Sequence, residues 1–257
     1  ILNSAGQRDV QDTVAALLSL GERAERNHYP LSALKLRLIA IYQLRRSGTL
    51  GAVNQADALL SSRPPWLAAQ SAAAAAATWS YEKAQMSLEH RGDDRAAWRD
   101  LRTAEDLYAS VADPSHVAVV LKQADILARA GAVQEARARL ATVLQRCDAG
   151  PCRADLVPSI RTTLAWVILL DPDAEAADLQ SAKQLLQVAL SSGSASLDLV
   201  ERANIWTNLA YAQARCGEPF EHALLTARQL LDGLPLEALA RAREVRSWTD
   251  LVEGLAE

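Results

Sequence analysis

Apolar residues recur along most of the chain at the three- and four-residue spacing of an amphipathic helix. In segment 9–27, for example, Val10, Val14 and Leu17 fall on one stripe. Prolines and glycines interrupt this pattern at intervals, and no stretch alternates as a half-buried strand would. We therefore predict about twelve helices and no strand, over 9–27, 30–47, 50–61, 66–90, 94–112, 114–130, 132–147, 155–170, 174–191, 196–215, 219–231 and 235–255.

The composition narrows the fold class further. Of 257 residues, 50 are alanine and 40 are leucine, both strong helix formers. Only 5% of the residues are aromatic, which is too few to support a sandwich or a barrel. The sequence therefore indicates an all-α protein with enough apolar residues for a sizeable core.

Two segments, 123–144 and 208–231, show the same arrangement of small residues around a glycine between two helices. The shared positions are Ala124 and Ala210 before the glycine, Gly131 and Gly217 themselves, and Ala136 and Ala223 after it. This arrangement resembles the tetratricopeptide repeat, in which small residues let the helices of a pair approach closely. A middle unit fits with Ala165 in the first small position. The 41- and 45-residue spacing of Ala124, Ala165 and Ala210 resembles the longer kinesin-light-chain-like and CHAT-associated repeats.

The resemblance implies a right-handed α-solenoid of about five or six antiparallel helix pairs. We expect a single domain over 1–257, with divergent helices in 1–63 and tetratricopeptide-like repeats plus a C-terminal capping helix in 64–257. An irregular all-α bundle is the alternative.

In tetratricopeptide proteins the first helix of each pair lines a concave groove that binds peptides, so the resemblance implies a set of partner-binding positions. These are Trp79, Glu82, Met86, Asp125, Arg129, Trp166, Asn204, Thr207, Tyr211 and Arg215. The alternative for the tryptophans is packing between repeats. Lys and Asn do not occupy the positions that bind chaperone tails in the carboxylate-clamp proteins of this family, so we do not expect that specificity.

The charge and the motifs exclude several function classes. A net charge of −4 argues against nucleic acid as a partner. No apolar run reaches the roughly 18 residues of a membrane span. The four histidines include no pair four residues apart, and no phosphate-binding or nucleophile motif occurs. We therefore expect no enzyme activity, no metal and no cofactor.

These observations predict a non-catalytic scaffold that binds a protein or peptide. The alternative is a sensing domain that controls an attached effector, such as a protease or ATPase, in a longer bacterial protein. We leave the compartment open and favour the cytoplasm. Cys147 and Cys152 bracket a short loop and could close a ring under oxidising conditions, or could stay reduced.

Overall fold

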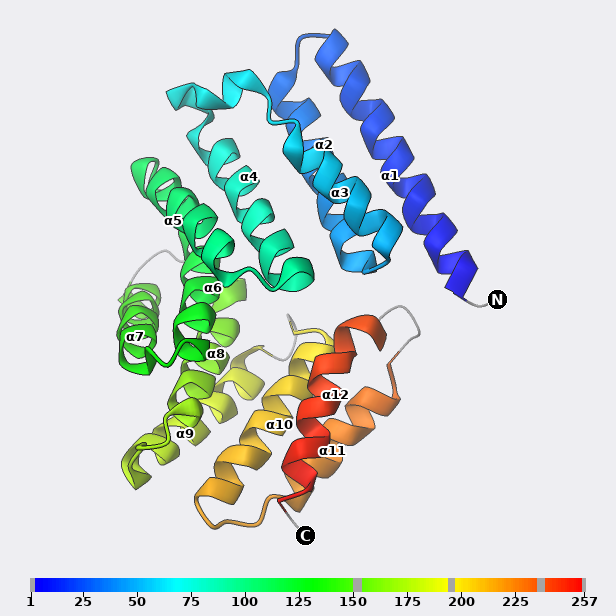
Figure 1. Ribbon diagram of the computed structural model, residues 1–257. Helices are drawn as coiled ribbons and strands as arrows, with labels where there is room; N and C mark the ends of the chain where they lie inside the picture. Colours follow the sequence, from blue (N-terminus) through cyan, green and yellow to red (C-terminus); the bar gives the residue numbers. More distant parts are fainter. Residues whose placement is uncertain (1–2, 150–153, 194–196, 235–238, 256–257) are drawn as a thin grey trace. The chain divides into compact units, whose positions relative to one another are not determined.

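In the computed structural model the chain divides into two compact units, Ile1–Val119 and Val120–Glu257 (Figure 1). The structure describes residues 3–149, 154–193, 197–234 and 239–255. The division falls inside a helix and does not coincide with the expected change of character at residue 63. We describe each unit by itself, and the expectation of one domain over the whole chain stays a prediction.

The first unit is built from consecutive helices joined by short connections. They are α1 (Asn3–Arg26), α2 (Pro30–Ser47), α3 (Leu50–Ser61), the 3₁₀ turns η1 (Pro65–Ala68) and η2 (Gln70–Ala72), α4 (Ala73–Met86), the π-helical turn η3 (Ser87–Arg91) and α5 (Asp94–Ser110). The most extensive contacts join α1 to α2 and α4 to α5, and α2 also packs on α3 and α4.

The second unit repeats one arrangement of helices. After α6 (His116–Arg129), which spans the division between the units, come α7 (Val133–Ala149), the turn η4 (Ala154–Leu156), α8 (Val157–Leu170), α9 (Ala176–Gly193), α10 (Leu199–Arg215), α11 (Glu221–Asp232) and α12 (Leu239–Glu253). The pairs α8–α9 and α10–α11 have the most extensive contacts. The first helices also pack in order, α8 on α10 and α10 on α12.

Local sequence signals explain where these helices begin and end. Asp198 accepts a hydrogen bond from the Glu201 backbone N–H, and the Glu201 side chain accepts one from the Asp198 N–H, so the two residues form a capping box at the start of α10. Gly131 and Gly217 follow α6 and α10 with φ of 82° and 68°. Glycine adopts this left-handed conformation without strain, so the chain can reverse directly into the second helix of each pair.

The prediction of an all-α fold made of successive helix pairs is confirmed, and the described residues contain no strand. Ala124, Ala165 and Ala210, the small positions used to align the repeats, are all completely buried. Each lies in the core cluster of the second unit, together with large residues such as Leu186 and Ile205. The repeating contacts of first and second helices distinguish the second unit from an irregular bundle.

The cysteines occupy different environments. Cys147, near the end of α7, is disulfide-bonded, whereas Cys216 at the end of α10 is a free, partly buried thiol. Cys152 lies outside the described residues.

The close approach of α10 to its neighbours predicts the effect of enlarging Ala210. We expect Ala210→Leu to destabilise the protein by about 1–3 kcal/mol, because the added atoms have no space at a completely buried helix contact. Urea unfolding followed by circular dichroism measures this difference.

The control is Ala138→Leu, which makes the same change at an exposed position of α7 and should alter stability by less than about 0.5 kcal/mol. Equal stabilities for Ala210→Leu and the unchanged protein would show that the repeat register is wrong.

Candidate partner-binding site

Three aromatic side chains from three successive first helices meet in the second unit. Trp166 comes from α8, Tyr211 from α10 and Trp248 from α12. The Trp248 ring lies 5.2 Å from Trp166 and 5.0 Å from Tyr211 between centroids, and both contacts are edge-to-face. All three side chains are only partly buried. We call this group the aromatic surface.

Buried polar contacts beneath the aromatic surface fix α12 against α10, the two helices that lie side by side in Figure 1. The indole N–H of Trp248 donates to Oδ1 of Asn208 at 2.9 Å, and Asn208 is itself buried. The neighbouring residues Thr207 and Thr249 have their hydroxyls 2.9 Å apart, and both residues are completely buried. These bonds hold the Trp248 ring in one orientation, which lowers the entropy lost when a partner binds.

The sequence predicted Trp166 and Tyr211 but missed Trp248 and Asn208. Trp248 lies in the helix that was expected to cap the repeats, so no repeat position was assigned to it. Thr207 was expected to contact a partner, but its hydroxyl is buried against Thr249, so that assignment stays a prediction. The residues on the first helix of a repeat therefore form two groups. Some face solvent, and others contact the next first helix.

Arg215, another expected partner-binding residue, forms hydrogen bonds with the backbone at the end of a neighbouring helix. Its guanidinium donates to the carbonyl oxygens of Leu169 at 2.9 Å and Asp171 at 3.1 Å. The last carbonyls of a helix have no partner within the helix, so these bonds satisfy the end of α8. Arg215 thereby joins α10 to α8, and its replacement would cost stability as well as any contact with a partner.

The remaining expected residues of the second unit are accessible. Asp125 and Arg129 on α6 form an ion pair at 3.4 Å across one turn, with about half of each side chain exposed. Asn204 on α10 is partly buried. The pair α6–α7 joins the same core as α8, and Gln123 of α6 accepts a hydrogen bond from Arg139 of α7 at 2.8 Å.

In the first unit, the three expected partner-binding residues lie in the interior. Trp79, Glu82 and Met86 on α4 have exposures of 1%, 7% and 2%. Because α2, α3 and α5 all pack on α4, this helix has no broad free face. These three side chains are therefore not accessible to a partner in this structure, and Trp79 packs in the core. Their assignment to a partner stays a prediction.

Glu82 instead belongs to a buried ion network. Nε of Arg45, on α2, donates to Glu82 at 3.2 Å, and Arg45 also contacts Glu89 in η3. Burial raises the pKa of Glu82 and outweighs the opposing charge of Arg45. Burial alone would lower the pKa of Arg45, but the two carboxylates together raise it. Arg45 therefore stays charged and holds α2, α4 and η3 together.

Comparisons with known proteins add the following. No protein-family model and no curated protein matches the chain. One solved structure that matches is described as nearly identical TPR-like repeats of a kinesin light chain from Podosopora anserina. It has 19% identity and a TM-score of 0.44, and the match covers 93% of this chain and 96% of that one.

The described residues contain no group of three or more His, Cys, Asp or Glu side chains placed to hold a metal ion. None of their helices combines the length and the apolar character that crossing a bilayer requires. The aromatic surface is thus the strongest candidate site that coincides with residues expected from the sequence.

The buried network predicts a pH-dependent effect of removing Arg45. We expect Arg45→Met to destabilise the protein by about 3–5 kcal/mol near neutral pH, because the Glu82 carboxylate is left buried without its partner. The raised pKa of Glu82 means that the folded state takes up a proton more readily than the unfolded state. The loss should therefore shrink as the pH falls from about 7 to about 5, as urea unfolding at several pH values would show.

The control is Lys35→Met, which removes a cation from an exposed position of the same helix and should change stability by less than about 0.5 kcal/mol. A cost for Arg45→Met that does not change with pH would mean that Glu82 is not the group left uncompensated.

Proposed function

We propose that this protein is a non-catalytic interaction module that binds a protein or peptide through the aromatic surface of Trp166, Tyr211 and Trp248. The observation that carries the proposal is the meeting of three partly exposed aromatic rings from three successive first helices. A large aromatic side chain is usually buried in the core of its own chain when no partner needs it. Rings held at an accessible surface by buried hydrogen bonds are typical of an interface centre.

The chemistry of this surface favours a partner with apolar side chains. Aromatic rings offer a large contact area with few rotatable bonds, so little entropy is lost when they bind. The half-exposed ion pair of Asp125 and Arg129 supplies both charge signs on the first helix of an adjoining pair. Charges of this kind at the edge of an interface set specificity and association rate more than affinity.

The experiment is a selection of phage-displayed random peptides against the immobilised chain, followed by calorimetry with the selected peptides. The Tyr211→Ala variant serves as the counter-selection target, so that peptides bound elsewhere are removed. A thermal melt of each variant establishes that it is folded.

We expect Tyr211→Ala to weaken binding of the selected peptides by about 1–2 kcal/mol, or roughly 5- to 30-fold. The loss follows from removing the contact area of the ring and the edge support that it gives to Trp248. The matched control is Gln229→Ala on α11, an exposed second-helix position that should leave the affinity unchanged.

If Gln229→Ala weakens binding and Tyr211→Ala does not, the partner uses the second helices and the aromatic surface is not the site. A selection that yields no peptide dependent on Tyr211 would also contradict the proposal.

A further inference from the structure

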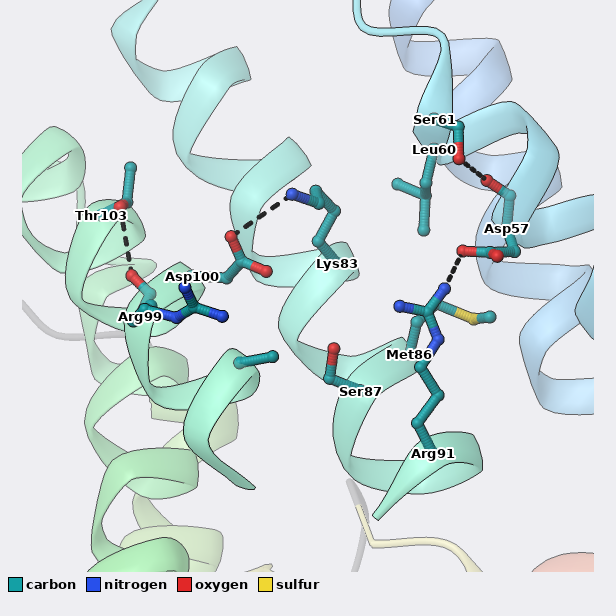
Figure 2. A pocket seen from close by; sticks show the side chains of 11 residues that line it. Asp57, Leu60, Ser61, Lys83, Met86, Ser87, Arg91, Arg99, Asp100 and Thr103 are labelled. Atoms are coloured by element: carbon teal, nitrogen blue, oxygen red, sulfur yellow. Dashed lines mark hydrogen bonds and ion pairs between the residues drawn. The ribbon is translucent and has the colours of Figure 1, made fainter. Parts of the chain in front are cut away.

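The first unit contains a groove of about 350 Å³ lined by α3, α4, η3 and the first half of α5 (Figure 2). It is distinct from the aromatic surface, which belongs to the other unit. Its floor includes the apolar side chains of Leu60 and Met86, and its walls carry charged side chains from four elements. A groove of this size lies within the range of small-ligand and peptide side-chain sites.

The walls of the groove contain two ion pairs that contribute little to stability. Arg91 of η3 pairs with Asp57 of α3, and Lys83 of α4 pairs with Asp100 of α5 at 3.5 Å. Between a quarter and a half of each of these side chains is exposed. Exposed pairs of this kind contribute only about 0–1 kcal/mol to stability. A ligand can therefore replace one partner of such a pair with little loss of free energy.

A third cation makes the groove positive. Arg99 extends from α5 toward the groove (Figure 2), and within the described parts of the chain no carboxylate forms an ion pair with it. With Lys83 and Arg91 it gives three positive charges against the two of Asp57 and Asp100. The groove therefore attracts a ligand that brings one negative charge.

A serine hydroxyl also faces this space. Ser87 is only 3% exposed, its side chain lines the groove, and Figure 2 shows its hydroxyl directed into it. Among the residues that the structure describes, none is a hydrogen-bond partner of this hydroxyl. The hydroxyl oxygen is open to the groove, so it can hydrogen-bond to a ligand that enters there.

Ser87 owes its position to the π-helical turn. Its carbonyl oxygen accepts from the backbone N–H groups of Gly92 and Asp93, the latter at 3.0 Å, in place of the regular α-helical pattern. Wide turns of this kind cost stability and occur often at functional sites. Here the turn brings Ser87 and Arg91 to the same groove.

We propose that this groove binds a peptide segment through one acidic side chain. The carboxylate accepts hydrogen bonds from the Arg99 guanidinium and the Ser87 hydroxyl, and the neighbouring peptide side chains contact Leu60 and Met86. Asp57 and Asp100 accept hydrogen bonds from the peptide backbone N–H groups. The same two carboxylates repel a free dianion, and the groove is several times larger than phosphate, so a peptide fits better than an inorganic anion.

The test is a titration of the isotope-labelled full chain by NMR. The probe is a pentapeptide with blocked termini that carries one glutamate between two leucines, and the comparison peptide carries glutamine instead. We expect the glutamate peptide to shift the amide signals of Ser87 and Arg99 saturably. The glutamine peptide should bind about tenfold more weakly or worse, because a charge-assisted hydrogen bond is lost.

The decisive variants lie on one helix. Arg99→Gln should weaken binding of the glutamate peptide about tenfold, whereas Arg102→Gln, the same charge change at an exposed position outside the groove, should alter it less than twofold. Ser87→Ala should weaken binding about threefold or more. Both arginines are exposed, so their replacement leaves the fold intact and the comparison holds even if Ser87→Ala does not fold.

Several outcomes would overturn the proposal. They are the absence of saturable shifts at millimolar peptide, equal losses for Arg99→Gln and Arg102→Gln, and shifts confined to the second unit. Equally effective competition by inorganic phosphate would show a general anion site and not a peptide site.

Discussion

The close approach of helices through alanine is the constraint on which the rest of this structure depends. Completely buried alanines such as Ala124, Ala165 and Ala210 occupy the contacts between helices, where a larger side chain has no room. Larger apolar residues, such as Leu140 and Ile168, then fill the spaces between the pairs. In the second unit, bulky aromatic residues such as Trp166 and Tyr211 lie at the edges of these contacts and stay partly exposed. Together with Trp248 they make up the aromatic surface.

The two units solve the problem of buried polar groups in different ways. In the second unit neutral groups pair with one another, as Thr207 does with Thr249. In the first unit a full charge is buried, and the carboxylates of Glu82 and Glu89 together outweigh the effect of burial on the pKa of Arg45. The arrangement requires Glu89 to come from η3, so the π-helical turn also completes the network. The same turn exposes Ser87 to the groove on its other side.

Sequence periodicity predicted the helices and their order well but assigned faces less reliably. Glycine and capping residues mark helix ends locally, so most ends were close to those observed. The π-helical turn was missed because its hydrogen bonding depends on packing and has no distinct sequence pattern. Trp79, Glu82 and Met86 were assigned to a partner because a repeat position identifies a first helix but not how many neighbours cover it. Trp248 was missed because its contacts come from residues about 40 positions away.

The groove was beyond sequence reasoning for a further reason. Its charged residues come from α3, α4, η3 and α5, and each looks like an ordinary solvated residue of its own helix. What distinguishes them is the imbalance of three cations against two carboxylates around the Ser87 hydroxyl, which exists only after the helices pack. The aromatic surface and the groove therefore differ in chemistry. The aromatic surface offers contact area that buried hydrogen bonds hold rigid, whereas the groove offers exposed ion pairs around an accessible serine hydroxyl. A surface of the first kind contributes most of its binding energy by excluding water, and a groove of the second kind selects for a particular charge.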